Sequence, residues 1–158
     1  MGAKSEALAK QLEAKIRQVM ATLENLSDTD WKRVTEAEKW TVGVTAHHLA
    51  GVLEQISKMV EAVVAGESLD FTNDMIDKMN AKHAKDFADC TKAETIDLLK
   101  RGSAVADRVI RGMSDDHLAK SGMVMAGVPP MTAEQLIRGG ILNHIDDHLG
   151  SIRKTVGK

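Results

Sequence analysis

Three histidines in this sequence have the types and spacing of metal ligands. His144 and His148 are four residues apart, so on a helix both imidazoles would project from the same side, one turn apart. Two such rings can reach one ion at about 2.0–2.1 Å, and His48 could supply a third nitrogen from a facing helix. Three protein ligands leave coordination positions open for water or substrate, which is typical of a catalytic metal site.

Our hypothesis is that His48, His144 and His148 hold one divalent metal ion. Zn²⁺ or Ni²⁺ is expected first, and Fe²⁺ or Co²⁺ would also accept imidazole ligands. The alternative is that these histidines are hydrogen-bonded residues of a helical core, which is the commoner role of a single histidine on an apolar face. Because two polar rings are costly to bury without partners, the spacing of His144 and His148 supports the metal site about as well as it supports the core interpretation.

The remaining histidines have no clear chemical role in the sequence. His47 is rotated about 100° around its helix from His48, so it could face a neighbouring helix, the solvent or a metal ligand. His83 and His117 lie in polar surroundings and are expected to be solvated.

Three acidic residues could assist the histidines. Asp146 and Asp147 could orient ligand imidazoles through hydrogen bonds, although a solvated position on the outer face of the helix is favoured for both. Glu54 follows His48 by six residues, nearly on the same side of the helix, and is a candidate for a general base. No catalytic residue is assigned.

Composition favours an all-α protein that folds as one domain over residues 1–158. Hydrophobic residues make up 43% and charged residues 28% of the chain, and only two prolines occur. Tyrosine is absent, and Phe and Trp occur twice each, although strands prefer aromatic residues. A chain of this length can bury a sizeable core.

Apolar residues at spacings of three and four predict four principal helices. They are expected over residues 5–26, 42–65, 92–113 and from 132 towards the C-terminus, with a long connection between the second and the third. Thr41 is expected to cap the second helix, and Gly66 suits the left-handed position that closes it. Thr91–Glu94 and Thr132–Gln135 have the form of capping boxes. His48 falls in the apolar stripe of the second helix.

Three segments that connect the principal helices have no strong helical pattern. Residues 32–39, between two tryptophans, indicate an irregular turn or a short helical segment. The segment 69–90 could contain a helix capped by Asn73, but its apolar stripe is weak, and an excursion between the principal helices is expected. The loop 119–131 carries two glycines and two prolines and could shape the mouth of a pocket.

Charge, hydropathy and cysteine content exclude several classes of function. A net charge of −2 gives no reason to expect nucleic-acid binding, which usually requires a clustered basic face. No run of about 18 apolar residues predicts a transmembrane helix. The single cysteine, Cys90, cannot form an internal disulfide, so a cytoplasmic location is expected.

Two stretches resemble signature motifs of the DinB/YfiT-like superfamily. They are Trp40–Leu49, in which a histidine precedes Leu49, and His144–Ile152, in which His148 precedes Leu-Gly. Residues 79–82 and 113–118 extend the similarity over nearly the whole chain. The resemblance implies an up-down-down-up four-helix bundle, often dimeric, with a divalent metal held by three histidines. By the superfamily's spacing the ligand lies eight residues after the tryptophan, which selects His48 rather than His47.

The resemblance also implies a class of reaction. Some superfamily members are enzymes that use bacillithiol, mycothiol or glutathione, and others have no assigned activity. We therefore expect a metal-dependent thiol transferase that acts on small electrophiles, with a low-molecular-weight thiol as cosubstrate and a homodimer as the assembly. The alternatives are a metal-dependent hydrolase that activates water and a non-catalytic, stress-related binding protein.

Overall fold

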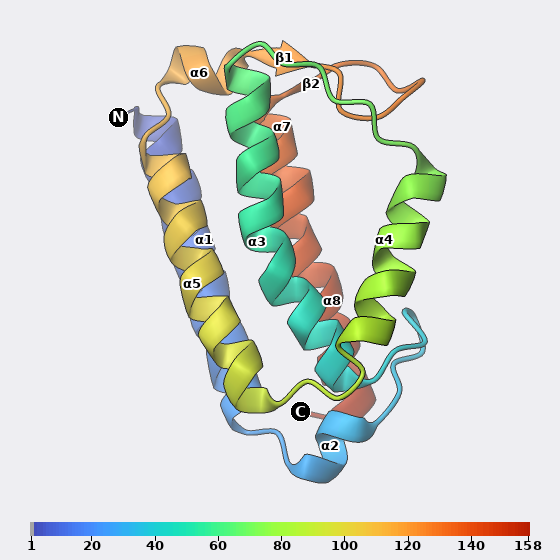
Figure 1. Cartoon of the computed structure of the whole chain (residues 1–158). Helices are drawn as coiled ribbons and strands as arrows, with labels where there is room; N and C mark the ends of the chain where they lie inside the picture. Colours follow the sequence, from blue (N-terminus) through green and yellow to red (C-terminus); the bar gives the residue numbers. More distant parts are fainter. Residues whose placement is uncertain (1) are drawn as a thin grey trace.

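The computed structural model describes residues 2–158, which are mostly helical with one small two-stranded sheet (Figure 1). The elements in chain order are α1 (Ala3–Glu24), α2 (Asp28–Lys32), α3 (Val42–Val64), α4 (Asn73–Asp86), α5 (Lys92–Arg111), α6 (Asp115–Ala119), β1 (Ser121–Gly122), β2 (Met131–Thr132), α7 (Ala133–Ile137), the π-helical segment η1 (Arg138–Asn143) and α8 (His144–Val156). The all-α prediction is confirmed at this level.

Long helices lie side by side along the length of the molecule. Helix α5 packs against α1 and α3, and α3 packs against α7 and α8 (Figure 1). Helix α4 stands apart from this group, on the side opposite α1 and α5 in Figure 1. None of its residues is buried. The helix predicted only weakly in the segment 69–90 therefore forms, but outside the main packing.

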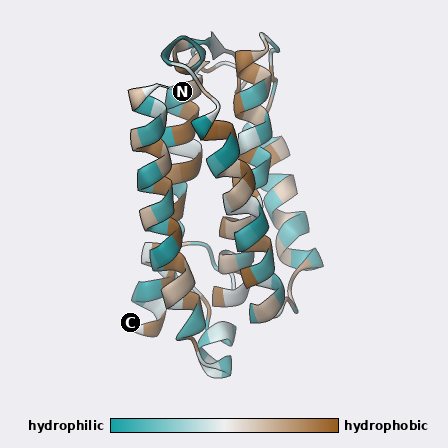
Figure 2. Ribbon diagram, turned by 90° about the vertical axis from the view of Figure 1, so that its left-hand side faces the viewer, coloured by the Kyte–Doolittle hydropathy of each residue, from teal (hydrophilic) through white to brown (hydrophobic). Residues whose placement is uncertain are grey.

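Hydrophobic and hydrophilic positions alternate along the long helices, as their periodicity predicts (Figure 2). The largest buried side chains include Leu12, Leu49, Leu99, Ile137 and Ile152, which come from α1, α3, α5, α7 and α8 respectively. Helices α3 and α5 approach closely at Gly102, where an added Cβ would lie 2.9 Å from the carbonyl oxygen of Ala50. One core thus joins these helices.

Helix ends follow the predicted capping with one exception. The Thr41 hydroxyl accepts a hydrogen bond from the Val44 amide at 3.1 Å, and both predicted capping boxes form. Gly66 closes α3 with φ +84°. Helix α4 is capped by Thr72 rather than by the predicted Asn73, which is the first helical residue. The Thr72 hydroxyl, three residues before Met75, accepts a hydrogen bond from the Met75 amide at 3.1 Å.

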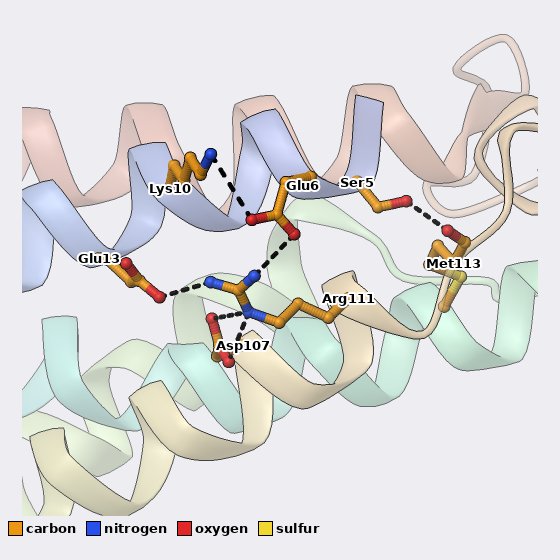
Figure 3. A network of polar contacts seen from close by, with 7 residues as sticks. All are labelled: Ser5, Glu6, Lys10, Glu13, Asp107, Arg111 and Met113. Carbon is orange, nitrogen blue, oxygen red and sulfur yellow. Dashed lines mark hydrogen bonds and ion pairs between the residues drawn. The ribbon is translucent and has the colours of Figure 1, made fainter. Parts of the chain in front are cut away.

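An ion-pair network joins α1 to α5 near the end where the chain begins (Figure 3). The Arg111 guanidinium donates to the carboxylates of Glu6, at 2.8 Å, and of Glu13, both on α1, and to Asp107 one turn earlier in its own helix. These hydrogen bonds raise the pKa of Arg111 above its usual range, led by the bond to Glu6. Ser5 and the Met113 carbonyl form a further hydrogen bond between the same regions.

The last helical run is not one uniform α-helix. Segment η1 inserts a π-helical stretch directly before His144, a feature that the regular spacing of four did not predict. π-Helical stretches inside α-helices are frequent at functional sites. Here the stretch contains Gly139 and Gly140 and leads directly into the helix that carries His144 and His148.

Candidate metal centre

The three predicted histidines converge between α3 and α8. Nε2 of His144 lies 3.3 Å from Nε2 of His48 and 2.8 Å from Nε2 of His148. One ring nitrogen from each residue lies within 4.8 Å of the other two. His48 is buried, and the other two are partly buried. The periodicity that placed His48 in the inward stripe of α3 therefore also brings it to the pair on α8.

The separations fit a shared ion. Two nitrogens that each lie about 2.1 Å from one metal ion are roughly 3.0–3.4 Å apart when the angle between them is 90–109°. The His48–His144 separation of 3.3 Å lies in this range, and the His144–His148 separation of 2.8 Å lies just below it. The donor set of three imidazoles suits Zn²⁺, Ni²⁺, Fe²⁺ or Co²⁺.

Glu38 fixes the orientation of His148. Its Oε1 lies 2.9 Å from Nδ1 of His148, and its Oε2 accepts a hydrogen bond from the Ser151 hydroxyl at 2.6 Å. Burial raises the pKa of this carboxyl, but hydrogen bonds, led by the one from Ser151, outweigh it and hold the pKa below its usual value. An ionised carboxylate can only accept, so Nδ1 of His148 donates to Glu38 and its Nε2 lies on the side of His144.

A tight loop before α3 presents this carboxylate. The Thr35 amide donates to the Trp40 carbonyl at 2.8 Å, and the Lys39 amide donates to the Thr35 carbonyl at 3.1 Å. Lys39 adopts a left-handed φ of +62°, a conformation that costs a non-glycine residue about 1–2 kcal/mol. This strained residue lies between Glu38 and Trp40, whose ring centroid is 5.2 Å from that of His48. Segment 32–39 is thus part of the site rather than only a connection.

Burial keeps the imidazoles of His48 and His144 neutral near pH 7. It lowers the pKa of His48 to about 3, helped by the neighbouring His148 and His144, and it lowers the pKa of His144 to about 4, helped by His148. Neutral imidazole is the form that binds a metal. Protons therefore do not compete for these two nitrogens near neutral pH.

His47 and His83 form a second pair beside the three histidines. Nδ1 of His47 lies 2.8 Å from Nε2 of His83, and the ring of Phe87 stacks on His47 at a centroid distance of 4.0 Å. His47 therefore faces α4, one of the alternatives that its rotation left open. The prediction that His83 is solvated is wrong, because α4 folds back against α3 and packs His83 5.5 Å from the ring of His48.

A cavity of about 720 Å³ opens beside the three histidines. His48 and His144 line it, together with residues of α3, α4 and η1. The loop 119–131, expected to shape a pocket mouth, contributes no lining residue. Instead it holds the neighbouring segment in place, since the Phe71 amide donates to the Val124 carbonyl at 3.1 Å, and Phe71 itself lines the cavity.

The acidic candidates lie outside the centre. Asp146 pairs with Lys15 at 2.6 Å on the surface, and Asp147 is exposed. Glu54 pairs with Lys58 at 3.3 Å and does not line the cavity. The favoured interpretation of the aspartates as surface residues agrees with these positions, whereas the carboxylate that contacts His148, Glu38, was not predicted. Its separation of 110 residues from His148 left no pattern in the sequence.

The prediction that His117 is solvated is confirmed. His117 is exposed and accepts a backbone hydrogen bond from Ser114 at 3.2 Å as part of a helix cap. Cys90 is buried, and burial raises the pKa of its thiol, so it is not an activated nucleophile. Within residues 2–158, no helix is long and apolar enough to cross a bilayer.

Comparison with known proteins identifies a family. A family model described as the mycothiol maleylpyruvate isomerase N-terminal domain matches residues 12–139. The match includes Glu38 and His48 and ends before His144 and His148. No curated protein matches the chain. The chain therefore belongs to the mycothiol maleylpyruvate isomerase N-terminal domain family, within the DinB/YfiT-like superfamily.

Proposed function

We propose that this protein is a metal-dependent enzyme that transfers a low-molecular-weight thiol to a small electrophile. The observation that carries the proposal is the convergence of three imidazole nitrogens within 4.8 Å of one another, with His48 and His144 in the wall of a cavity. The family description adds mycothiol, a low-molecular-weight thiol, as the cosubstrate class.

His48, His144 and His148 would hold the ion in this proposal. A divalent ion bound there supplies a positive charge that lowers the pKa of a thiol ligand, so that the thiol loses its proton near neutral pH. The chain's own residues prepare that site. Burial keeps His48 and His144 neutral near pH 7, and Glu38 holds His148 in the tautomer whose Nε2 is free to bind. The cavity beside them admits the second reactant.

The overall reaction is a simple transfer. The S–H bond of the thiol breaks, and a bond forms between sulfur and an electrophilic carbon of the substrate. With a halide substrate the halide leaves with the electron pair of its bond to carbon, and the thiol proton is released. With an activated double bond or an epoxide, the proton ends on the substrate. No oxidant or reductant is required.

The same proposal includes the architecture and the assembly. The long segments α1, α3, α5 and α7–α8 would constitute an up-down-down-up four-helix bundle that forms one domain, with α4 in the long connection between the second and third helices. The side-by-side packing of these segments supports this arrangement (Figure 1). A homodimer is proposed from the superfamily resemblance, and sedimentation of the purified protein would test it.

The first test is metal content. Protein purified without a histidine tag, stripped with a chelator and incubated with Zn²⁺ or Ni²⁺ should retain about one ion per chain by elemental analysis. His148→Ala should retain none, whereas His117→Ala, which removes an exposed histidine outside the site, should behave as the original protein. Stoichiometric metal in His148→Ala would contradict the ligand assignment.

The second test is thiol dependence. The metal-loaded protein is mixed with 1-chloro-2,4-dinitrobenzene and one thiol at a time, namely mycothiol, bacillithiol or glutathione. Formation of the thioether is then followed. The proposal expects turnover that requires both metal and thiol and disappears in His148→Ala. Release of chloride without any thiol would indicate a hydrolase instead. Absence of bound metal, and no stabilisation by added Zn²⁺ or Ni²⁺, would indicate a non-catalytic binding protein.

A further inference from the structure

The cavity beside the three histidines has largely apolar walls. Apolar side chains line it from α3 and from the α4 side, namely Val52, Ile56, Met59, Ile76, Met79 and Phe87. Its volume of about 720 Å³ is in the range of pockets that bind small molecules, which is about 300–1,000 Å³. The space is thus large enough for a reactant with a substantial body in addition to the atoms that reach the histidines.

The charged residues at the cavity already have partners and point outwards. Lys58 pairs with Glu54 at 3.3 Å, and Lys82 pairs with Asp86 one turn later in α4. The two lysine side chains are 70% and 76% exposed. Among the lining residues, all within the described part of the chain, there is no arginine and no buried cation. A carboxylate that entered the cavity would lose its hydration without gaining an ionic partner from these walls.

Two glycines of η1 lie at the cavity wall, one packed closely and one in open space. A Cβ added at Gly140 would lie 3.0 Å from Cγ2 of Ile56, so the backbone of η1 packs directly on α3 at this point. A Cβ added at Gly139 would meet nothing within 4 Å, although this residue lines the cavity. Side chains at position 139 would therefore extend into open space at the cavity without disturbing the core.

We infer that the molecule brought to the three histidines carries a neutral apolar body, aromatic or aliphatic, which binds between α3 and α4, and that the walls of the metal-free cavity disfavour small dicarboxylates. This inference names the substrate class for the proposed function and rests on it for the role of the histidines. The physical reason is that burying apolar surface in this cavity lowers its free energy, whereas an anion in the metal-free cavity finds no buried cation among the lining side chains. The inward side of α4 is then a specificity-determining wall.

Two methionines of α4 provide a matched pair of variants. Met79 lines the cavity and Met75 does not, although their exposed fractions are similar at 48% and 44%. Replacing either with Gln keeps the length of the side chain and the helix propensity but adds a polar amide. Gly139→Met and Gly150→Met form a second pair, because an added Cβ meets nothing within 4 Å at either position, and only Gly139 lines the cavity.

The probe is N-phenyl-1-naphthylamine, a neutral dye whose fluorescence rises in apolar surroundings, titrated into metal-free and zinc-loaded protein. We expect one dye per chain, with affinity lowered at least about fivefold in Met79→Gln and clearly lowered in Gly139→Met. Met75→Gln and Gly150→Met should stay within about twofold of the original protein. Millimolar maleate, a small dicarboxylate, should not displace the dye from the metal-free protein.

Equal losses in Met79→Gln and Met75→Gln would place the dye on the exposed surface of α4 and overturn the inference. Displacement by maleate, or absence of dye binding, would overturn it as well. Metal content is measured separately on the same samples. If the dye binds as expected but zinc does not, the proposed function fails while the apolar binding site stands. If zinc binds but the dye does not, only the assignment of the substrate class fails.

Discussion

Replacing Glu38 with Gln tests how the protein prepares its proposed metal site. The variant keeps the shape of the side chain but removes the charge that holds Nδ1 of His148 at 2.9 Å. The side chains of this pair are only 12% and 11% exposed, so solvent screens the interaction weakly. An amide can still accept from the imidazole, but it can also present its NH₂ group, and then the tautomer of His148 is no longer fixed.

The size of the effect follows from the type of hydrogen bond. A hydrogen bond to a charged group contributes about 1.5–3 kcal/mol and a neutral one about 0.5–1.5 kcal/mol. The difference of about 1–1.5 kcal/mol corresponds to roughly a tenfold change in affinity. Loss of a carboxylate that orients a metal-bound histidine generally costs about 10–100-fold. We therefore expect Zn²⁺ to bind Glu38→Gln about 10–100 times more weakly.

Glu36→Gln is the matched control. It removes one negative charge from the same loop, but Glu36 pairs with Lys154 at 3.3 Å through side chains that are 78% and 76% exposed. Exposed pairs contribute about 0–1 kcal/mol, so zinc affinity should change less than about threefold. Competition with a chromophoric chelator measures both affinities. If the two variants bind zinc equally well, Glu38 does not prepare His148 for metal binding and the reasoning fails.

Three further predictions concern stability. Burial lowers the pKa of His48 to about 3 in the folded protein, whereas a histidine in the unfolded chain has a pKa of about 6.5. The unfolded chain therefore binds more protons below about pH 6.5, and the free energy of unfolding of the metal-free protein should fall there by up to about 1.4 kcal/mol per pH unit. Equal urea midpoints at pH 7 and pH 5 would exclude this effect. Gly43→Ala places a Cβ 2.4 Å from Nε1 of Trp31 and should lower the free energy of unfolding, measured in urea, by about 1–3 kcal/mol. Gly150→Ala lies in open space and should raise it by about 0.5–1 kcal/mol. An unchanged stability of Gly43→Ala would contradict the close packing at Trp31. Arg111→Met should lower the thermal midpoint, and less so in high salt, because salt screens exposed ion pairs; a salt-independent loss would point to packing rather than charge.

Much of the helical framework could be predicted because its causes are local. Thr41, Thr91 and Thr132 each cap the helix that follows, since a hydroxyl and the amide it satisfies are only three residues apart. The apolar stripe of α3 placed His48 inwards, and the spacing of four placed His144 and His148 on one face. The prediction missed the π-helical segment and the short β1–β2 pair, because neither leaves a distinctive pattern of apolar residues.

The parts of the site that were not predicted depend on long-range contacts. Glu38 meets His148 across 110 residues, and His83 meets His47 across 36. In the sequence Glu38 is an ordinary acidic residue in a polar link, and His83 is a histidine in a polar helix. Both acquire a role only when the loop before α3 folds onto α8 and α4 folds back onto α3. The cavity likewise needs residues from α3, α4, η1 and α8 to enclose it.

The sequence by itself determined that the protein is helical and which three histidines could act together. Local periodicity, capping and the spacing of side chains on a helix are enough for both, because they depend on residues within one or two turns. Only the tertiary structure decided that the three Nε2 atoms converge, that Glu38 orients His148, and that an apolar cavity adjoins them. Those features arise from packing between distant segments, in which burial and pairing depend on how the whole chain folds.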